Sequence, residues 1–513
     1  MTKSIENNLY YRLGIDKPER GQVRVLQTDS GKVWTYGDLS DMAKSLGQKL
    51  IRLGVQQGDR ISVQVDKSVE ALALYLACLR IGAVYHPLNT AYSLVELDYF
   101  IENAAPRVLV CSTDREELLT QLAVKCGVDV VLTLDISGTG SLVSDLPEAQ
   151  DSAPVSVNSS TSAALLYSSG TTGRPKGIVL THENLASNAE VLVDLWGFSA
   201  DDVLLHSLPI YHVHGLFVAC HCVLLSGASM LWNAGFEVHK VLEQLGRSSV
   251  MMGVPTYYSR LLSLPEFDSG SCKSMRLFIS GSAPLLSSTF AEFERRTGHR
   301  ILERYGMTET GMSTSNPLNG ERRAGTVGFP LPGIALRVED DHGLILAAGE
   351  VGNLLVKGPN VFKEYWGMPE KTAADFTEDG FFKTGDLATI DADGYVAIVG
   401  RSKDLIITGG LNVYPKEVEL VIDRCDGVLE SAVIGLSDDD FGERVVAVIV
   451  PDGTKNEADL KHTIRRELQE SLAGFKRPKD YIVIDSLPRN AMGKVQKALL
   501  RERFAGESVT LTS

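Results

Sequence analysis

The sequence contains few cysteines and carries no excess of positive charge. Its seven cysteines are odd in number and scattered among 513 residues, which argues against a disulfide framework or a zinc cluster. We therefore expect reduced thiols in a cytoplasmic protein. The formal net charge of -15 argues against nucleic acid as a partner, so any site for an anion must be local.

Long apolar runs are also lacking in the sequence. The two most apolar stretches, 70–87 and 216–232, are interrupted by Arg80, His221 and Gly227, which argues against a membrane span. The first residues, MTKSIENNLYYRL, have neither the apolar core of a secretory leader nor the arginine-rich character of a transit peptide. A chain of this length accommodates about two to four globular domains.

What the sequence does contain is a glycine-rich stretch, LYSSGTTGRPKG, at residues 166–177. Apolar runs precede and follow it, at 163–167 and 178–180, which predicts a strand, a loop and a second strand. The glycines allow close approach to a ligand, and the hydroxyls and cations of the loop favour phosphate. Lys176 lies between Pro175 and Gly177, so the stretch is not a Walker A motif. Taken alone, it is also compatible with a glycine-rich turn that binds nothing.

The remaining chain predicts an α/β protein. In the first third, strands at 61–65, 107–111 and 129–134 alternate with helices, one of them capped by Ser68 and ended by Gly82. This alternation is typical of a largely parallel sheet with helices on its faces. Residues 349–400 instead read as short strands separated by turns. The last hundred residues read as a compact α+β unit.

Several later segments place polar residues at the ends of apolar strands. Each segment alone is compatible with ordinary core and turn. His206, His212 and His214 lie close together in LHSLPIYHVHGLF, but no Cys or Asp joins them at a useful metal-binding spacing. The other segments are MMGVPTYYSRLL at 251–262, MRLFISGSAPL at 275–285, ERYGMTET at 303–310, GFFKTGDL at 380–387, GRSKD at 400–404 and LPRNAMGKVQK at 487–497.

In this order, the segments resemble the adenylate-forming superfamily of acyl-CoA synthetases, aryl-CoA ligases, luciferases and nonribosomal adenylation domains, and the resemblance covers nearly the whole chain. It implies an α/β fold with a large N-terminal adenylation domain, residues 1–402, which has parallel-rich sheets and a β-rich subdomain. A small mobile α+β C-terminal domain, residues 403–513, is expected to follow, with its hinge at Lys403.

The resemblance also implies cofactors and site residues. ATP and Mg²⁺ are the expected cofactors, and coenzyme A is the expected co-substrate. The expected catalytic residues are Lys494, Glu309 and His214, and Glu309 and Thr171 are the expected magnesium ligands. The expected ATP-binding residues are Ser168, Ser169, Gly170, Thr171, Thr172, Gly173, Lys176, Gly281, Ser282, Ala283, Glu303, Arg304, Tyr305, Gly306, Met307, Thr308, Asp386 and Arg401.

Within the superfamily, the chain is most similar to malonyl-CoA synthetases. The segments that carry this likeness are PLNTAYSLVELDYF at 87–100, LPIYHVHGLF at 208–217, GVPTYYSRLL at 253–262 and FISGSAPLL at 278–286. We expect Arg260 to lie near the start of a helix, in the acid pocket, where burying an unpaired arginine would be costly unless a second substrate carboxylate paired with it. His206 and Ser282 are the further candidates for holding malonate. The alternative interpretation of Arg260 is a surface arginine on a helix.

The expected reaction joins malonate to CoA at the expense of ATP, through a malonyl adenylate, with release of pyrophosphate and AMP. The alternative is a ligase for another short or dicarboxylic acid, such as methylmalonate or oxalate, or for an aryl acid. A luciferase-like oxygenase would need a large aromatic pocket, against which Arg260 argues. A nucleotide-binding regulator without activity would be expected to lack Lys494 or Glu309, and both are present.

Overall fold

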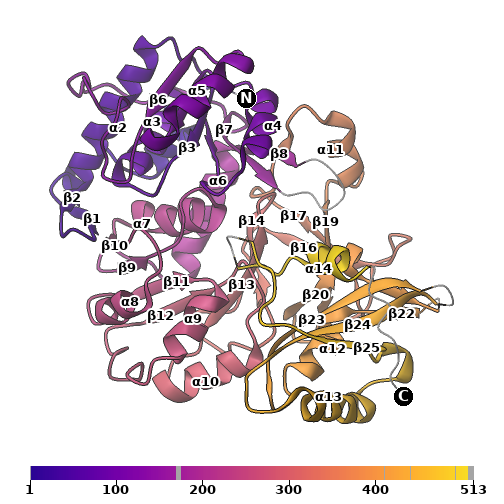
Figure 1. The fold of residues 1–513 in the computed structure, drawn as a ribbon. Helices are drawn as coiled ribbons and strands as arrows, with labels where there is room; N and C mark the ends of the chain where they lie inside the picture. Colours follow the sequence, from indigo (N-terminus) through magenta and orange to yellow (C-terminus); the bar gives the residue numbers. More distant parts are fainter. Residues whose placement is uncertain (1, 169–174, 410, 439–440, 491–492, 506–513) are drawn as a thin grey trace.

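The computed structural model describes residues 2–168, 175–409, 411–438, 441–490 and 493–505. Figure 1 shows two α/β lobes built from the first part of the chain, a β-rich layer beside them, and a smaller lobe formed by the last part. The predicted α/β class, with parallel-rich sheets and a β-rich subdomain, is confirmed. Within the described ranges, no helix is both long and apolar enough to cross a membrane.

The first lobe contains a seven-stranded sheet in the order β18-β8-β7-β4-β3-β5-β6. Its central pairs are parallel, whereas β8 pairs antiparallel with both β7 and β18. The predicted helix between Ser68 and Gly82 is present. The strands are β3 (Arg60–Gln64), β4 (Val84–Pro87), β5 (Val108–Cys111), β6 (Val130–Thr133), β7 (Ser162–Ser168), β8 (Lys176–Thr181) and β18 (Glu364–Tyr365), and the helices are α2 (Tyr36–Arg52), α3 (Val69–Ile81), α4 (Leu94–Ala104) and α5 (Glu116–Lys125).

The second lobe contains a nine-stranded sheet in the order β15-β14-β13-β12-β11-β9-β10-β1-β2. From β1 to β13 the neighbouring strands are parallel, so the carboxyl ends of β9, β11, β12 and β13 meet at one edge. The strands are β1 (Arg24–Thr28), β2 (Val33–Thr35), β9 (Val203–His206), β10 (Ser229–Trp232), β11 (Val250–Gly253), β12 (Leu277–Ser280), β13 (Leu302–Met307), β14 (Gly311–Ser315) and β15 (Phe329–Pro330). The helices are α1 (Leu9–Arg12), α6 (His182–Leu195), the π-helix η4 (His214–Cys220), α7 (His221–Ser226), α8 (Val238–Leu245), α9 (Pro255–Leu262) and α10 (Ser287–Thr297).

Helix α3 lies in the core that joins the two lobes. All of its residues except Glu70 are buried, as expected for a helix that is apolar on every side. The Tyr75 hydroxyl lies 2.8 Å from Nε2 of His221 at the start of α7, which ties α3 to the second lobe. The two sheets are therefore held against each other by packed apolar helices, and their strand ends are fixed relative to one another.

The β-rich layer is an antiparallel sheet in the order β16-β17-β19-β20. The predicted hairpin around the turn at 391–394 is confirmed as β19 and β20. Its register places Asp386 opposite Arg401. The elements are β16 (Ala335–Glu339), β17 (Gly352–Lys357), helix α11 (Pro369–Asp375), β19 (Phe382–Ile390) and β20 (Val396–Arg401).

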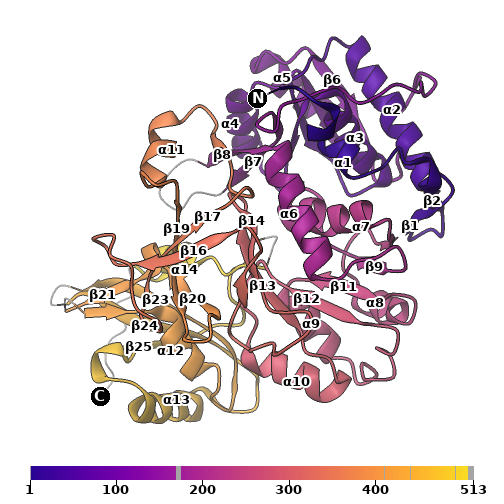
Figure 2. The same cartoon turned by 180° about the vertical axis from the view of Figure 1, so that it is seen from behind.

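The last lobe is built on antiparallel strands, to which β25 adds in parallel. Figures 1 and 2 both show it beside the β-rich layer, with α12 facing β20. The boundary between 402 and 403 stays a prediction. The elements are β21 (Ile406–Thr408), β22 (Leu411–Val413), α12 (Pro415–Ile422), β23 (Val428–Asp438), β24 (Gly442–Pro451), α13 (Glu457–Ser471), β25 (Asp480–Val483) and α14 (Lys497–Phe504).

Candidate active site

The glycine-rich stretch joins two paired strands, as its sequence predicts. Ser168 ends β7 and Lys176 begins β8, and the two residues are directly paired. The strand pair therefore holds both ends of the loop at the edge of the first sheet. The expected phosphate contacts Ser169, Gly170, Thr171, Thr172 and Gly173, and with Thr171 one expected magnesium ligand, lie outside the described residues.

Asp386, Arg401 and Tyr305 form one connected group. Arg401 Nε lies 2.7 Å from Asp386 Oδ1, and the Tyr305 hydroxyl donates to Asp386 Oδ2. Burial, together with the charge of Asp386, raises the pKa of Tyr305 well above its ordinary value. Asp386 keeps only 4% of its side chain exposed, and the two donors hold it at a fixed place. Such a carboxylate is suited to accept hydrogen bonds from sugar hydroxyls.

Glu309 follows β13 and is buried with little compensation. Burial raises its pKa, although the charges of Arg401 and Lys176 act in the opposite direction. The positive charges that act on the carboxylate are those of Arg401 and Lys176, and they do not fully offset its burial. A divalent cation bound there would supply the missing positive charge, so the residue fits the expected magnesium ligand.

The ends of β12 and β13 bring together most of the remaining expected nucleotide contacts. Ser282 adopts a left-handed backbone conformation with φ of 70°, which is strained for a residue with a side chain. Glu303 accepts from the backbone N–H of Gly325 at 3.3 Å, and burial raises its pKa to about 8. The residues of this group are Gly281, Ser282, Ala283, Glu303, Arg304, Tyr305, Gly306, Met307 and Thr308.

Arg304 differs from the other residues of β13. Successive side chains of a strand point to opposite faces, so Arg304 lies on the other side from Tyr305. It is only 4% exposed, and its Nε and Nη2 atoms have no hydrogen-bond partner among the described residues. Burial lowers its pKa to about 10. These two nitrogens form the edge of a guanidinium that binds a carboxylate with two parallel hydrogen bonds, which suits an acid substrate better than ATP.

His214 lies beside Arg304 at the start of the π-helix. Its Nδ1 is 3.3 Å from Oγ of Ser282, and its buried Nε2 has no partner in the described part of the chain. Burial, with the charge of Arg304, lowers its pKa well below the ordinary value, so the imidazole is neutral. π-helical turns often occur at functional sites, and this one carries a ring nitrogen without a partner among the described residues, on a histidine that the charge of Arg304 reaches.

His206 does not have the role expected from the sequence. Its Nδ1 is 2.7 Å from Nζ of the buried Lys67, and its Nε2 is 2.9 Å from the carbonyl oxygen of Gly215. Both ring nitrogens are therefore occupied, and no free nitrogen remains for a substrate carboxylate. Burial lowers the pKa of Lys67 to about 7. The expected contact with malonate is replaced by a structural role, in which His206 holds the π-helix against the end of β9.

The burial expected of Arg260 is not observed, and its assignment to malonate stays a prediction. Its side chain is exposed in the last turn of α9, not buried near the start of that helix, so the argument from a buried unpaired charge does not apply to it. It lines a cavity of about 230 Å³ between α9 and the last lobe. The other lining residues are Leu208, Pro209, Val254, Thr256, Tyr257, Arg489, Asn490 and Gly493.

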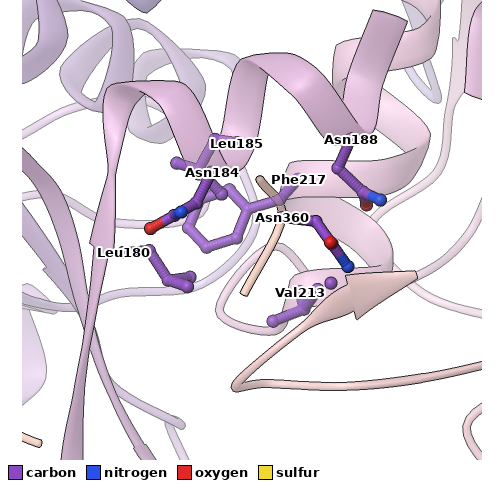
Figure 3. Close-up of a pocket in the computed structure, with 8 residues that line it drawn as sticks. Leu180, Asn184, Leu185, Asn188, Val213, Phe217 and Asn360 are labelled. Carbon is purple, nitrogen blue, oxygen red and sulfur yellow. The ribbon is translucent and has the colours of Figure 1, made fainter. Parts of the chain in front are cut away.

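A second cavity lies deep beneath helix α6, as shown in Figure 3. Asn184 and Asn188 reach it from α6, and Phe217 and Asn360 close it from the other side. Its volume of about 10 Å³ is roughly that needed for a single water molecule. This cavity is a packing feature and is too small to take part in substrate binding.

Lys494 reaches the site from the last lobe. Gly493, which has a φ of 74°, forms the turn before it, and the backbone N–H of Lys494 donates to Oδ1 of Asn490 at 3.0 Å. A Cβ added at Gly493 would lie 3.7 Å from Oγ1 of Thr256, so the turn rests on the start of α9. The residue is exposed, but the loss of water around its ammonium and the charges of Arg401 and Lys403 lower its pKa to about 8.

Lys403, the expected hinge, lies in a short turn between β20 and β21. Burial lowers its pKa. Asp404, the next residue, pairs with Arg501 of α14 at 2.7 Å, which anchors the chain to the last lobe directly after Lys403. The backbone of Lys403 is thus placed where the two parts of the chain meet, and its function as a hinge stays a prediction.

Comparisons with known proteins agree with this geometry. Residues 16–366 match the AMP-binding enzyme family, and residues 417–494 match the AMP-binding enzyme C-terminal domain. A malonate-CoA ligase of Arabidopsis thaliana is 34% identical over 530 residues, covering 94% of this chain and 87% of that protein. The crystal structure of ATP-bound MatB from Rhodopseudomonas palustris is 50% identical over 98% of this chain and 99% of that one, with a TM-score of 0.94. The apo structure of MatB, with the same identity and coverage, gives a TM-score of 0.83.

Proposed function

This chain belongs to the AMP-binding enzyme family, and from this premise we propose that it is an ATP-dependent malonate:CoA ligase. The products are malonyl-CoA, AMP and pyrophosphate, and malonyl adenylate is the intermediate. The observation that carries the choice of acid is the buried guanidinium edge of Arg304, which has no partner among the described residues. We place the enzyme in the cytoplasm, because its seven cysteines are free thiols.

The first half-reaction joins two anions. A carboxylate oxygen of malonate attacks the α-phosphorus of ATP, a P–O bond forms, and pyrophosphate leaves with the electrons of the broken bond. No general base is needed, because the attacking oxygen carries no proton. What the protein must supply is positive charge at the α-phosphate and the attacking carboxylate, and the Lys494 ammonium is the group assigned to that place.

The other carboxylate of malonate is what separates this acid from acetate or a fatty acid. We assign it to Nε and Nη2 of Arg304, with Nε2 of the neutral His214 as an additional donor. Taking a guanidinium out of water costs several kcal/mol, and a second carboxylate offsets that cost through a charge-assisted, bidentate hydrogen bond. An apolar acyl chain would leave the cost in place, so the pocket favours a dicarboxylate.

Mg²⁺ fits the residues present, since the buried Glu309 is an oxygen donor with too little positive charge around it. We assign Glu309, with Thr171 of the phosphate loop, to hold it. When bound, it would neutralise charge on the polyphosphate. We assign the Asp386 carboxylate, which Arg401 anchors, to the ribose hydroxyls, and we assign Lys176, at the end of the phosphate loop, to the β and γ phosphates.

The second half-reaction is attack of the CoA thiol on the adenylate carbonyl, with AMP as the leaving group. Lys494 occupies the site in the arrangement described here, so a pantetheine arm needs it to withdraw. We infer that residues 403–513 move as one domain about Lys403 between the two half-reactions. The anchoring of Asp404 to Arg501 supports this, because it makes the chain follow the last lobe from the residue after Lys403.

Substrate choice is tested by pyrophosphate release with a panel of acids. We expect malonate to give the highest kcat/KM, with methylmalonate next, and with succinate, oxalate, acetate and coumarate well below. The reason is that malonate and methylmalonate carry a second carboxylate, one carbon away from the first, that can pair with Arg304 while the first reacts, whereas acetate and coumarate carry none. A rate with acetate or coumarate far above that with malonate would contradict the dicarboxylate assignment.

The lowered pKa of Lys494 predicts a pH dependence for the first half-reaction. The ammonium is the active form, and because its pKa is about 8, that form is lost at a lower pH than for an ordinary lysine. We expect kcat/KM for malonate-dependent ATP–pyrophosphate exchange, measured without CoA, to fall about tenfold for each pH unit above about 8. Lys494→Arg stays protonated over this range, so the fall should disappear in that variant. If kcat/KM of Lys494→Arg still fell with the same midpoint pH, the fall would belong to another titrating group.

A further inference from the structure

Lys176 contacts two residues, Asp375 and Tyr365, that have no role in the proposed reaction. Its ammonium lies 3.7 Å from Oδ2 of Asp375, the last residue of α11, and 4.3 Å above the ring of Tyr365. The Lys176 and Asp375 side chains are only 21% and 19% exposed, so the pair is partly shielded from solvent. Oδ1 of Asp375 is bound more tightly, at 2.5 Å, by Lys371 from the preceding turn of the same helix.

The placement of this group follows from the sheet. Tyr365 belongs to β18, which pairs with β8 so that Tyr365 lies opposite Ile178, close to the start of β8 at Lys176. Helix α11 packs against β18, and Figure 1 shows it beside β8. Tyr365 interacts with Glu309 as well as with Asp375, and burial together with these two carboxylates raises the pKa of its hydroxyl. One buried ring thus connects the proposed magnesium residue with the partner of the phosphate-loop lysine.

We propose that Asp375 is a positioning residue that holds the Lys176 ammonium in the ligand-free enzyme and competes with the polyphosphate for it. This rests on the proposed use of ATP, and it adds a residue outside the expected site. The separation of 3.7 Å is longer than a direct charged hydrogen bond, whereas Asp375 keeps a short bond to Lys371. The Lys176 pair is therefore the weaker of the two, and the lysine can pass to a phosphate without leaving Asp375 unpaired.

The consequence is a lower affinity for both ATP and pyrophosphate than Lys176 alone would give. Pyrophosphate has to leave after each adenylation, so a competing carboxylate favours its release. A partly shielded pair of this kind is worth a factor of about three in a binding constant. Asp375→Asn should therefore lower the Kd of inorganic pyrophosphate, and that of ATP, about threefold, as measured by calorimetry in magnesium buffer without acid or CoA.

A double-mutant cycle separates this competition from two other effects. Loss of general negative charge and release of Lys371 are the two alternative explanations for tighter binding in Asp375→Asn, and either of them would act whether or not Lys176 is present. In a Lys176→Met background, we expect Asp375→Asn to leave the Kd of pyrophosphate unchanged. Asp375→Glu keeps the charge and should restore the weaker binding of the unmodified enzyme.

Glu370→Gln is the matched control, because Glu370 is an exposed acid at the start of the same helix. It should leave both dissociation constants unchanged. Weaker or unchanged binding in Asp375→Asn, or tighter binding that persists in the Lys176→Met background, would overturn the inference. The binding measurements need no acid substrate, so their outcome is independent of the malonate screen that tests the proposed function.

Discussion

Lys494→Ala is expected to lower the rate of malonyl-adenylate formation by about a hundredfold to a thousandfold while leaving the thiol step intact. The ammonium is assigned to bring positive charge to the α-phosphate and the attacking carboxylate, and alanine removes that charge. Adenylate formation is measured as malonate-dependent ATP–pyrophosphate exchange. The thiol step is measured separately, by supplying malonyl adenylate together with CoA and following the appearance of malonyl-CoA.

The separation of the two steps is what tests the role of the last lobe. If residues 403–513 withdraw Lys494 before the thiol enters, the second step does not need this lysine. Equal loss of both steps would contradict the two-arrangement account. Lys461→Ala is a suitable control, since Lys461 is a lysine of the same lobe that pairs with Glu457 on helix α13, away from the catalytic turn. It should leave both steps unchanged.

Local signals in the sequence predicted most of the fold. Ser68 and Gly82 bound helix α3 because a side-chain cap and a left-handed glycine act within one turn of the chain. The two strands around the phosphate loop follow from their apolar runs. Strand lengths are less predictable from such signals, as in β23 of the last lobe, which extends over Val428–Asp438. The ladder continues through half-buried and exposed residues, because pairing of the backbone does not require apolar side chains.

The candidate site shows the limit of local signals more clearly. His206 was expected to face the substrate, and its actual partner, Lys67, lies 139 residues earlier in the chain. Lys497, the last residue of the LPRNAMGKVQK segment, pairs at 2.5 Å with the buried Glu419. Neither contact has a signature in sequence spacing, since both depend on how separate elements pack. A polar residue within an apolar stretch of sequence indicates that its side chain has a partner, but it does not identify that partner.

The choice between Arg260 and Arg304 shows the same limit. The sequence argument required a buried arginine without a partner, and among the described residues Arg304 meets this requirement whereas the exposed Arg260 does not. Arg260 still lines the cavity beside the catalytic turn, and its contact with malonate stays a prediction. The motif ERYGMTET assigned Arg304 to the nucleotide along with its neighbours. The alternation of side chains along β13 separates it from Tyr305 and directs it to the opposite face. That signal was available from the predicted strand alone.

Arg304→Met is expected to lower kcat/KM for malonate by about a hundredfold to a few thousandfold, because removing one partner of a buried charge pair costs about 3 to 5 kcal/mol. The interaction that is lost is the one with the second carboxylate of malonate. Acetate has no second carboxylate, so its low kcat/KM should stay unchanged or rise. Arg304→Lys keeps the charge but loses the bidentate geometry. We expect its kcat/KM for malonate to lie between that of the unmodified enzyme and that of Arg304→Met. The measurement is pyrophosphate release with malonate and with acetate for each variant.

The same substitution should stabilise the ligand-free protein. An arginine that is 4% exposed and whose guanidinium has two unpaired nitrogens among the described residues costs free energy until substrate arrives, and methionine fills similar space without that cost. We therefore expect a Tm for ligand-free Arg304→Met about 2 °C or more above that of the unmodified enzyme, and no further rise when malonate is added. A lower Tm together with lost activity would indicate a packing role instead. If Arg260→Met abolished malonate use while Arg304→Met retained it, the second carboxylate would belong to the cavity beside α9.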